Sequence, residues 1–161
     1  MLKFFRPVNR KFLLPAGIMI VVIGMAAYVY FPRNLLSAAK LNDVKVDEIK
    51  SVTITVAAGS ELNEEDIHRH VTLYDSHSIK KVLSLLEDKY ARKKLNQSYS
   101  HDPFIGMFIS IHYVDSRTSE NKITTIDMIT SSQIMMNSSH YVLYGKGIDL
   151  PHVRDVLKEF Q

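Results

Sequence analysis

The sequence predicts an α+β protein in which an N-terminal transmembrane helix precedes an antiparallel sheet of about five to six strands, with two helices packed on one face. Three observations lead to this prediction. Residues 12–31 carry no charge, several later segments alternate apolar and polar residues as strands do, and two segments repeat apolar residues at helical spacing. We expect four parts: a basic N-terminus at 1–11, a transmembrane helix at 12–31, a tether at 32–47 and a folded domain at 48–161.

The uncharged stretch 12–31 has the length of a membrane-spanning helix. At about 1.5 Å rise per residue it covers the hydrocarbon thickness of a bilayer, and Pro15 falls in the first turn, where a missing N–H costs little. Four basic residues precede it, so the positive-inside rule predicts a cytoplasmic N-terminus and an extracytoplasmic domain at the cell membrane. The alternative is a cleaved signal peptide with Gly24 and Ala26 near the cleavage site, and the remainder is exported in either case.

Charge is distributed unevenly along the chain. The formal net charge is +3 and the pI is near 9.0, yet from residue 32 onward 16 Lys and Arg face 17 Asp and Glu. A basic surface that follows a phosphate backbone is not expected, which argues against a nucleic-acid partner. The chain has no cysteine, so disulfides, thiolate metal sites and cysteine nucleophiles are excluded.

The domain is expected to begin with two strands and a helix. Val52, Ile54 and Val56 alternate with polar residues, and a second strand is expected at 68–74, after an acidic stretch that we interpret as a solvated loop. Asp75 is a suitable N-cap for an amphipathic helix whose apolar spacing extends to Tyr90. The basic residues that follow suit the C-terminal end of that helix, because cations there are favoured by the helix dipole.

Further strands and a last helix complete the expected domain. The strands are predicted at 107–114, 122–130, 133–137 and 140–144, and the first of these is apolar on both faces, which is typical of a central strand. Asp149 can cap the last helix, and Pro151 lies in its first turn.

Two segments carry a resemblance to a known group of proteins. The segments DSHSIKKVLSLL and ITTIDMITSSQIMMNSSHYVLYGKGIDLPHVRDVL, with the strand before the first, resemble uncharacterised small exported α+β domains of Gram-positive bacteria, which are membrane- or lipid-anchored. The resemblance covers about residues 48–160. It implies an envelope location and an α+β fold, and it carries over no site residues.

Histidine is the one unusual residue type in the sequence. His68 and His70 are two apart on an expected strand, so both rings project from one face, and His77 lies just inside the next helix. These three are candidate ligands for zinc or copper. An outward, solvated pair explains the same pattern without a metal. The histidines are alternatively a pH sensor, since imidazoles titrate at about pH 6.5 and mild acidity would strengthen attachment to an anionic wall or lipid surface.

Other clusters have simpler interpretations. Asp75-Ser76-His77 and Ser100-His101-Asp102 place triad residue types side by side, but neighbours in sequence point apart, and a nucleophile needs groups that converge in space. Met128, Met135 and Met136 are expected to pack in the core rather than to bind copper.

The sequence therefore predicts a non-enzymatic, membrane-anchored extracytoplasmic binding or accessory module of the cell envelope. No cofactor is expected, and the expected partners are the membrane and another membrane or envelope protein. The alternative is a histidine-based envelope protein that responds to metal or pH.

Overall fold

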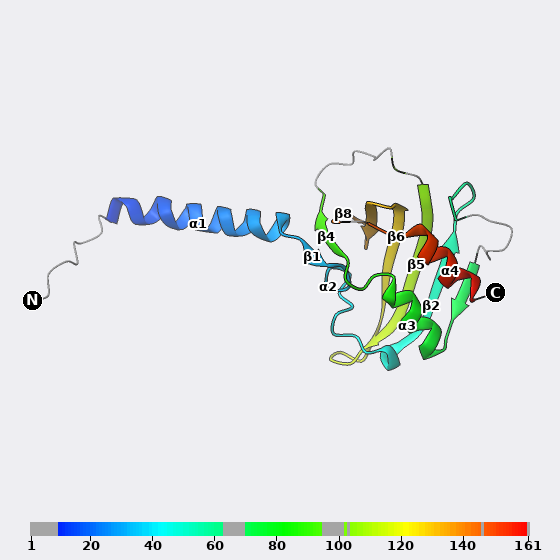
Figure 1. The fold of residues 1–161 in the computed structure, drawn as a ribbon. Helices are drawn as coiled ribbons and strands as arrows, with labels where there is room; N and C mark the ends of the chain where they lie inside the picture. Colours follow the sequence, from blue (N-terminus) through cyan, green and yellow to red (C-terminus); the bar gives the residue numbers. More distant parts are fainter. Residues whose placement is uncertain (1–9, 63–69, 95–101, 103, 146, 161) are drawn as a thin grey trace, which may run out of the picture. The chain divides into compact units, whose positions relative to one another are not determined.

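The chain divides into two compact units, residues 1–31 and residues 32–161. The computed structural model describes residues 10–62, 70–94, 102, 104–145 and 147–160, and within the first helix it describes the side chains at 15 and 17–27 (Figure 1). The whole sheet belongs to the second unit.

The first unit contains one helix, α1, over Arg10–Tyr30 with Pro15 inside it. Across the described residues, none of the helices has both the length and the apolar character required for crossing a bilayer. The predicted single-pass helix at 12–31 is therefore wrong, and so are the signal anchor and the extracytoplasmic location that depended on it.

The second unit is built on one sheet of eight strands in the order β1-β4-β8-β7-β6-β5-β2-β3. Every neighbouring pair is antiparallel. The strands are β1 (Arg33–Asn34), β2 (Ile49–Val56), β3 (His70–Leu73), β4 (Tyr90–Lys93), β5 (Phe104–Asp115), β6 (Glu120–Thr130), β7 (Gln133–Met136) and β8 (Ser139–Leu143). The helical segments are α2 (Leu35–Ala38), the 3-10 turn η1 (Val46–Glu48), α3 (Ser76–Ser84) and α4 (Leu150–Lys158).

The sheet is larger than the five to six strands that we expected, because β1 and β4 join the other six. The amphipathic pattern after Asp75 suggested a helix that reaches Tyr90, but α3 ends at Ser84. The backbone N–H groups of Leu85 and Leu86 bond three residues back, and Asp88 takes a left-handed φ of 56°. The chain then turns into β4, which pairs with both β8 and β1. The basic residues Arg92 and Lys93 therefore lie on a strand rather than at a helix end.

Residues 32–47, which we expected to form a tether, belong to the folded unit. The side chain of Asn34 accepts hydrogen bonds from the first turn of α2 and so caps this short helix. Leu35 and Ala39 have no exposed surface and lie in the core. The hydroxyl of Thr124 on β6 donates a hydrogen bond to the Ala39 carbonyl, at 3.2 Å. This segment therefore covers part of the sheet.

The core lies between one face of the sheet and the helices. Alternate residues of the central strands are buried on this face, for example Ile54 on β2 and Ile109 on β5. Helices α3 and α4 both lie on that side of the sheet (Figure 1), and Lys81 of α3 forms an ion pair with Glu159 after α4. The opposite face of the sheet has no helix over it among the described residues.

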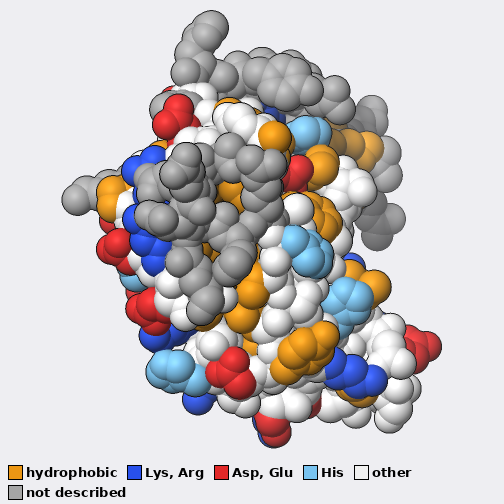
Figure 2. All heavy atoms as spheres, turned by 90° about the vertical axis from the view of Figure 1, so that its right-hand side faces the viewer, with side chains coloured by type: hydrophobic (Ala, Val, Ile, Leu, Met, Phe, Trp, Pro, Cys, Tyr) orange, Lys and Arg blue, Asp and Glu red, His pale blue; other side chains and the backbone are white. Residues whose placement is uncertain are grey.

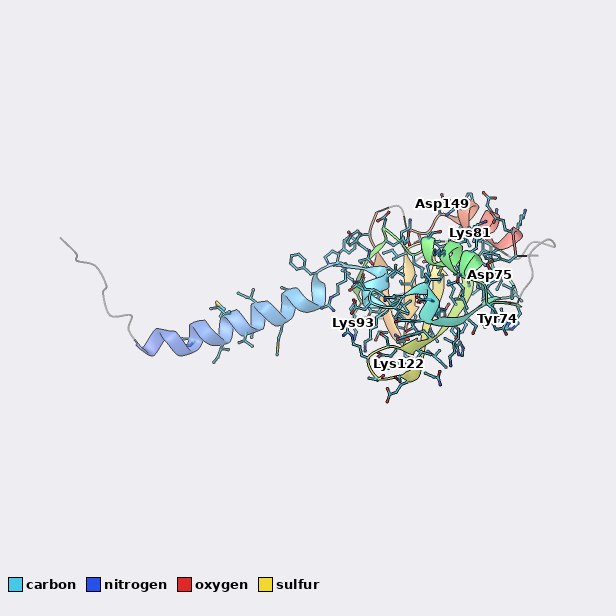
Figure 3. The ribbon with its side chains drawn as sticks, turned by 90° about the horizontal axis from the view of Figure 1, so that it is seen from below. Tyr74, Asp75, Lys81, Lys93, Lys122 and Asp149 are labelled. Atoms are coloured by element: carbon cyan, nitrogen blue, oxygen red, sulfur yellow. The ribbon has the colours of Figure 1, made fainter. Side chains whose placement is uncertain are left out.

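The starts of both long helices in this unit confirm the sequence prediction. Asp75 is the N-cap of α3, and its carboxylate accepts a hydrogen bond from the Ser78 N–H at 2.8 Å. Asp149 occupies the N-cap position of α4, with a proline in the first turn, although its side chain forms no capping hydrogen bond. Figure 3 shows both aspartates beside the helices that they begin.

Candidate functional site

One row of side chains crosses the uncovered face of the sheet from β3 to β8. The register of the strands places these residues directly opposite one another, pair by pair, and paired residues project on the same face. In spatial order the row consists of His70, Thr55, Phe108, Asp127, Met135 and His140. It brings together an acid, two imidazoles, a hydroxyl, an aromatic ring and a thioether from six strands.

All residues of this row except His70 line a hollow of about 520 Å³ on the uncovered face. Its lining is mainly apolar, with three polar side chains. The lining residues are Thr55, Ala57, Phe104, Gly106, Phe108, Asp127, Ile129, Met135 and His140. In the view of Figure 2, histidine side chains lie next to exposed hydrophobic side chains on part of the surface. A hollow of this size falls within the range of about 300–1,000 Å³ that is typical of small-molecule sites.

A bulge in β5 shapes one wall of the hollow. The register of β5 against β6 shifts between Phe104 and Met107, and Gly106 within the bulge has a left-handed φ of 56°. A Cβ atom on Gly106 would lie 2.6 Å from the Phe104 ring and 3.1 Å from the Ala57 Cβ. The absence of a side chain at this position therefore lets the Phe104 ring rest against the backbone.

Asp127 is the acidic residue of the hollow. It lies in mid-strand between Phe108 on β5 and Met135 on β7, both of which are apolar. Burial raises the pKa of Asp127 above its usual value, and the positive charge of protonated His140 opposes part of that rise. Among the described residues, the Asp127 carboxylate has neither a hydrogen-bond donor nor an ion-pair partner. A half-buried charge without a partner is costly and is a mark of a functional site.

The raised pKa of Asp127 predicts a pH-dependent stabilisation in the Asp127→Asn variant. Because the folded state holds this proton more tightly than the unfolded state, the contribution of Asp127 to stability falls as the pH rises through its folded pKa. Asp127→Asn should therefore increase the free energy of unfolding at neutral pH, and the gain should shrink as the pH falls. Urea denaturation of both proteins between pH 3 and pH 7 measures the difference.

Asp115 provides a control of opposite sign for this experiment. The hydrogen bond from Lys122 holds the pKa of Asp115 below its usual value, and the same pair raises the pKa of Lys122. Its stabilising contribution is present above the unfolded pKa of 3.8 and is lost as the pH falls through the folded value. Asp115→Asn should therefore lower stability at neutral pH. Shifts of the same sign in both variants would contradict the assignment of Asp127 as an unpaired acid.

A second, more polar hollow of about 760 Å³ lies at the end of the β5–β6 hairpin. Four of its charged residues form two ion pairs, Lys122 with Asp115 and Arg117 with Asp43 at 2.9 Å, and the Glu48 carboxylate accepts a hydrogen bond from the Lys45 backbone N–H at 3.0 Å. Each of the three carboxylates of this lining, Asp43, Glu48 and Asp115, therefore has a donor within the protein, unlike the carboxylate of Asp127.

The three predicted metal ligands are not brought together among the described residues. His68 lies outside the described residues. His70 points from the uncovered face, and its Nδ1 atom lies 3.1 Å from the Thr55 hydroxyl. His77 is exposed at the second position of α3, on the side of the sheet that carries the helices. In the described parts of the chain, no three His, Asp or Glu side chains are grouped as a metal site requires.

The other sequence clusters have mainly structural surroundings. Asp75 caps α3, whereas Ser100 and His101 lie outside the described residues, and Asp102 accepts a hydrogen bond from the Ser132 hydroxyl. The expected core packing of the methionines is confirmed for Met128 and Met136, which are 0% and 1% exposed. Met135 instead projects from the uncovered face and lines the hollow.

The sequence prediction missed Asp127 and the hollow around it. A signal was present, because aspartate is unfavourable in strands and Asp127 stands between Ile126 and Met128 in a segment predicted as a strand. Its neighbours in the row could not be found in the same way, because they depend on the register of six strands.

Comparison with protein-family models, with curated proteins and with solved structures finds no match for this chain. The resemblance to small exported domains therefore stays a prediction.

Proposed function

We propose that the folded unit is a non-enzymatic binding module whose ligand occupies the hollow on the uncovered sheet face. The observation that carries this proposal is the row across the sheet, which places an unpaired carboxylate among aromatic and thioether side chains in a hollow of about 520 Å³. Apolar walls with a few placed polar groups are typical of ligand sites. The proposal keeps the binding role expected from the sequence and leaves out the membrane anchor.

The spacing of the polar groups supports binding rather than catalysis. Thr55 and His140 each lie two strands away from Asp127, on opposite sides of it. With about 4.8 Å between neighbouring strands, these positions are roughly 10 Å from Asp127 along the row. A nucleophile and its base need direct hydrogen-bond contact, which these three groups do not have with one another.

The charge of the folded unit supports a ligand other than nucleic acid. From residue 32 onward the formal charges nearly balance, with 16 Lys and Arg against 17 Asp and Glu. The lining of the hollow includes Asp127, and none of its described residues is a lysine or an arginine. Phosphate groups would meet repulsion here rather than attraction.

Filling the hollow with a larger side chain tests this proposal. Thr55→Tyr places a ring in the hollow, and tyrosine is favourable in strands, so the variant should fold but lose affinity for small aromatic fragments by more than about tenfold. Saturation-transfer NMR with a panel of neutral, cationic and anionic fragments measures the binding.

Thr53 offers a matched control on the same strand and the same face. Its hydroxyl lies 3.1 Å from that of Thr72, just as the Thr55 hydroxyl lies 3.1 Å from His70, but Thr53 does not line the hollow. Thr53→Tyr should keep wild-type binding. If no fragment binds the wild type, or if both variants bind equally well, the hollow is not a ligand site.

A further inference from the structure

The hollow contains a charge that the described protein does not neutralise. Among the described residues of its lining, Asp127 is the one carboxylate, and the one possible cation is the imidazole of His140. His140 influences the carboxylate through space but forms no ion pair with it, and Met135 lies between them in the row. The carboxylate therefore faces a largely apolar space that has room for a cation from outside.

The walls of the hollow suit a cation that also carries an apolar body. Phe104 and Phe108 are 46% and 39% exposed, which leaves part of each ring free to contact a ligand. Phe108 is the direct cross-strand neighbour of Asp127. Aromatic faces attract ammonium groups, by about 0.5–1 kcal/mol at exposed sites and more where water is excluded. Ile129 and Met135 add aliphatic and thioether surface.

Burial explains why a cation would be preferred over a neutral molecule. The partial loss of water around Asp127, which also raises its pKa, is a cost that the protein bears in the unliganded state. An ammonium ion that donates a hydrogen bond to the carboxylate offsets this cost, and a charge-assisted bond is about twice as strong as a neutral one. An anion would add repulsion in the same place.

We propose that the hollow selects a small organic ammonium ion, with the charged group against Asp127 and the apolar body against Phe104 and Phe108. This inference rests on the proposed function, because it names the ligand class of the same hollow. A volume of about 520 Å³ suits a small molecule better than a macromolecular surface.

Three probes of nearly equal shape test the ligand class. 2-Phenylethylammonium is cationic, 2-phenylethanol is neutral, and phenylacetate is anionic. NMR titration of the full chain at neutral pH and low salt should show tighter binding of the ammonium probe than of the alcohol, by about tenfold, and the weakest binding for the anion.

Two variants on β6 locate the source of this selectivity. Asp127→Asn keeps the shape of the side chain and should remove the preference for the ammonium probe while the alcohol still binds. Glu120→Gln makes the same charge change at the exposed start of the same strand, outside the hollow, and should retain the preference.

The outcomes separate the ligand class from the binding function. If the alcohol or the anion binds the wild type as tightly as the ammonium probe, or if Asp127→Asn keeps the preference, the ligand class is wrong and the binding module stands. If none of the probes binds, both proposals fail. A second copy of the chain is the other candidate occupant of this face, and sedimentation velocity on the same sample tests it. A dimer that dissociates in the Phe108→Ser variant would assign the face to self-association and overturn the inference.

Discussion

Replacing Leu35 with alanine is expected to lower the free energy of unfolding of the folded unit by about 2–5 kcal/mol, the range of a buried leucine that leaves a cavity. Leu35 has no exposed surface and lies in the same core as the central strands. If residues 32–47 were only a tether, the substitution would have almost no effect. Urea denaturation of the full chain, followed by far-UV circular dichroism, gives the change.

The adjacent leucine is the control for this prediction. Leu36 has the same side chain and is the next residue of the short helix α2, but it is only partly buried against the core. Leu36→Ala should therefore cost clearly less than Leu35→Ala. Equal and small losses would place the segment outside the cooperative fold, whereas equal and large losses would show that both leucines are enclosed.

The sequence predicted the elements that carry a clear local signal, either a repeating apolar pattern or a helix-start residue. The alternation of Val52, Ile54 and Val56 marks β2, and all three side chains are buried on the core face. Asp75 marks the start of α3 because its side chain caps the helix, and Asp149 with the proline after it marks the start of α4. In such cases, local chemistry and tertiary packing favour the same structure.

The missed elements are short or contradict their local pattern. Strand β1 has two residues and shows no period. Tyr90 stands four residues after Leu86, which continues the helical spacing, yet the left-handed backbone at Asp88 ends that run and β4 begins. Pairing with β8 decides the conformation there, and a contact between segments that far apart in the chain is invisible to a local pattern.

The apolar stretch at the N-terminus shows the limit of a hydropathy argument. Its lack of charge predicted a helix, and α1 is helical over Arg10–Tyr30. The structure contradicts the further prediction that this helix crosses the membrane. The proposed function is independent of this step, because each residue that carries it lies on the sheet of the second unit.

The candidate site could not be predicted from the sequence, because it depends on the register between strands. His70, Phe108, Asp127 and His140 come from four different strands, and a slip of one residue in any pairing would move one of them to the core face. The histidine pattern did predict an outward-facing strand, and His70 is exposed as expected. Its partner in the row turned out to be a threonine hydroxyl rather than a metal ligand.

The substitution Gly147→Ala is expected to cost more than about 3 kcal/mol, which places it among the largest effects of a single residue. Gly147 has a φ of 65°, and a Cβ atom there would lie 2.1 Å from the Ser131 carbonyl oxygen. That oxygen accepts the Ile148 N–H at 2.8 Å, and the Gly147 carbonyl accepts Lys89 Nζ at 2.7 Å. A backbone shift that relieves the clash would break both bonds, which hold the segment before α4 against the β6–β7 turn.

The Gly145→Ala variant is the control that distinguishes the steric clash at Gly147 from the energetic cost of a left-handed backbone. Gly145 has a similar φ of 78°, but a Cβ atom there would meet nothing within 4 Å. Gly145→Ala should therefore cost only the left-handed strain of about 1–2 kcal/mol. Thermal unfolding of both variants, with hydrogen exchange at the Ile148 amide, measures the difference. Equal losses of stability in the two variants would mean that backbone strain alone acts at both positions and that the Ser131 carbonyl can move aside. In that case α4 is held by its own apolar face and not by this backbone contact.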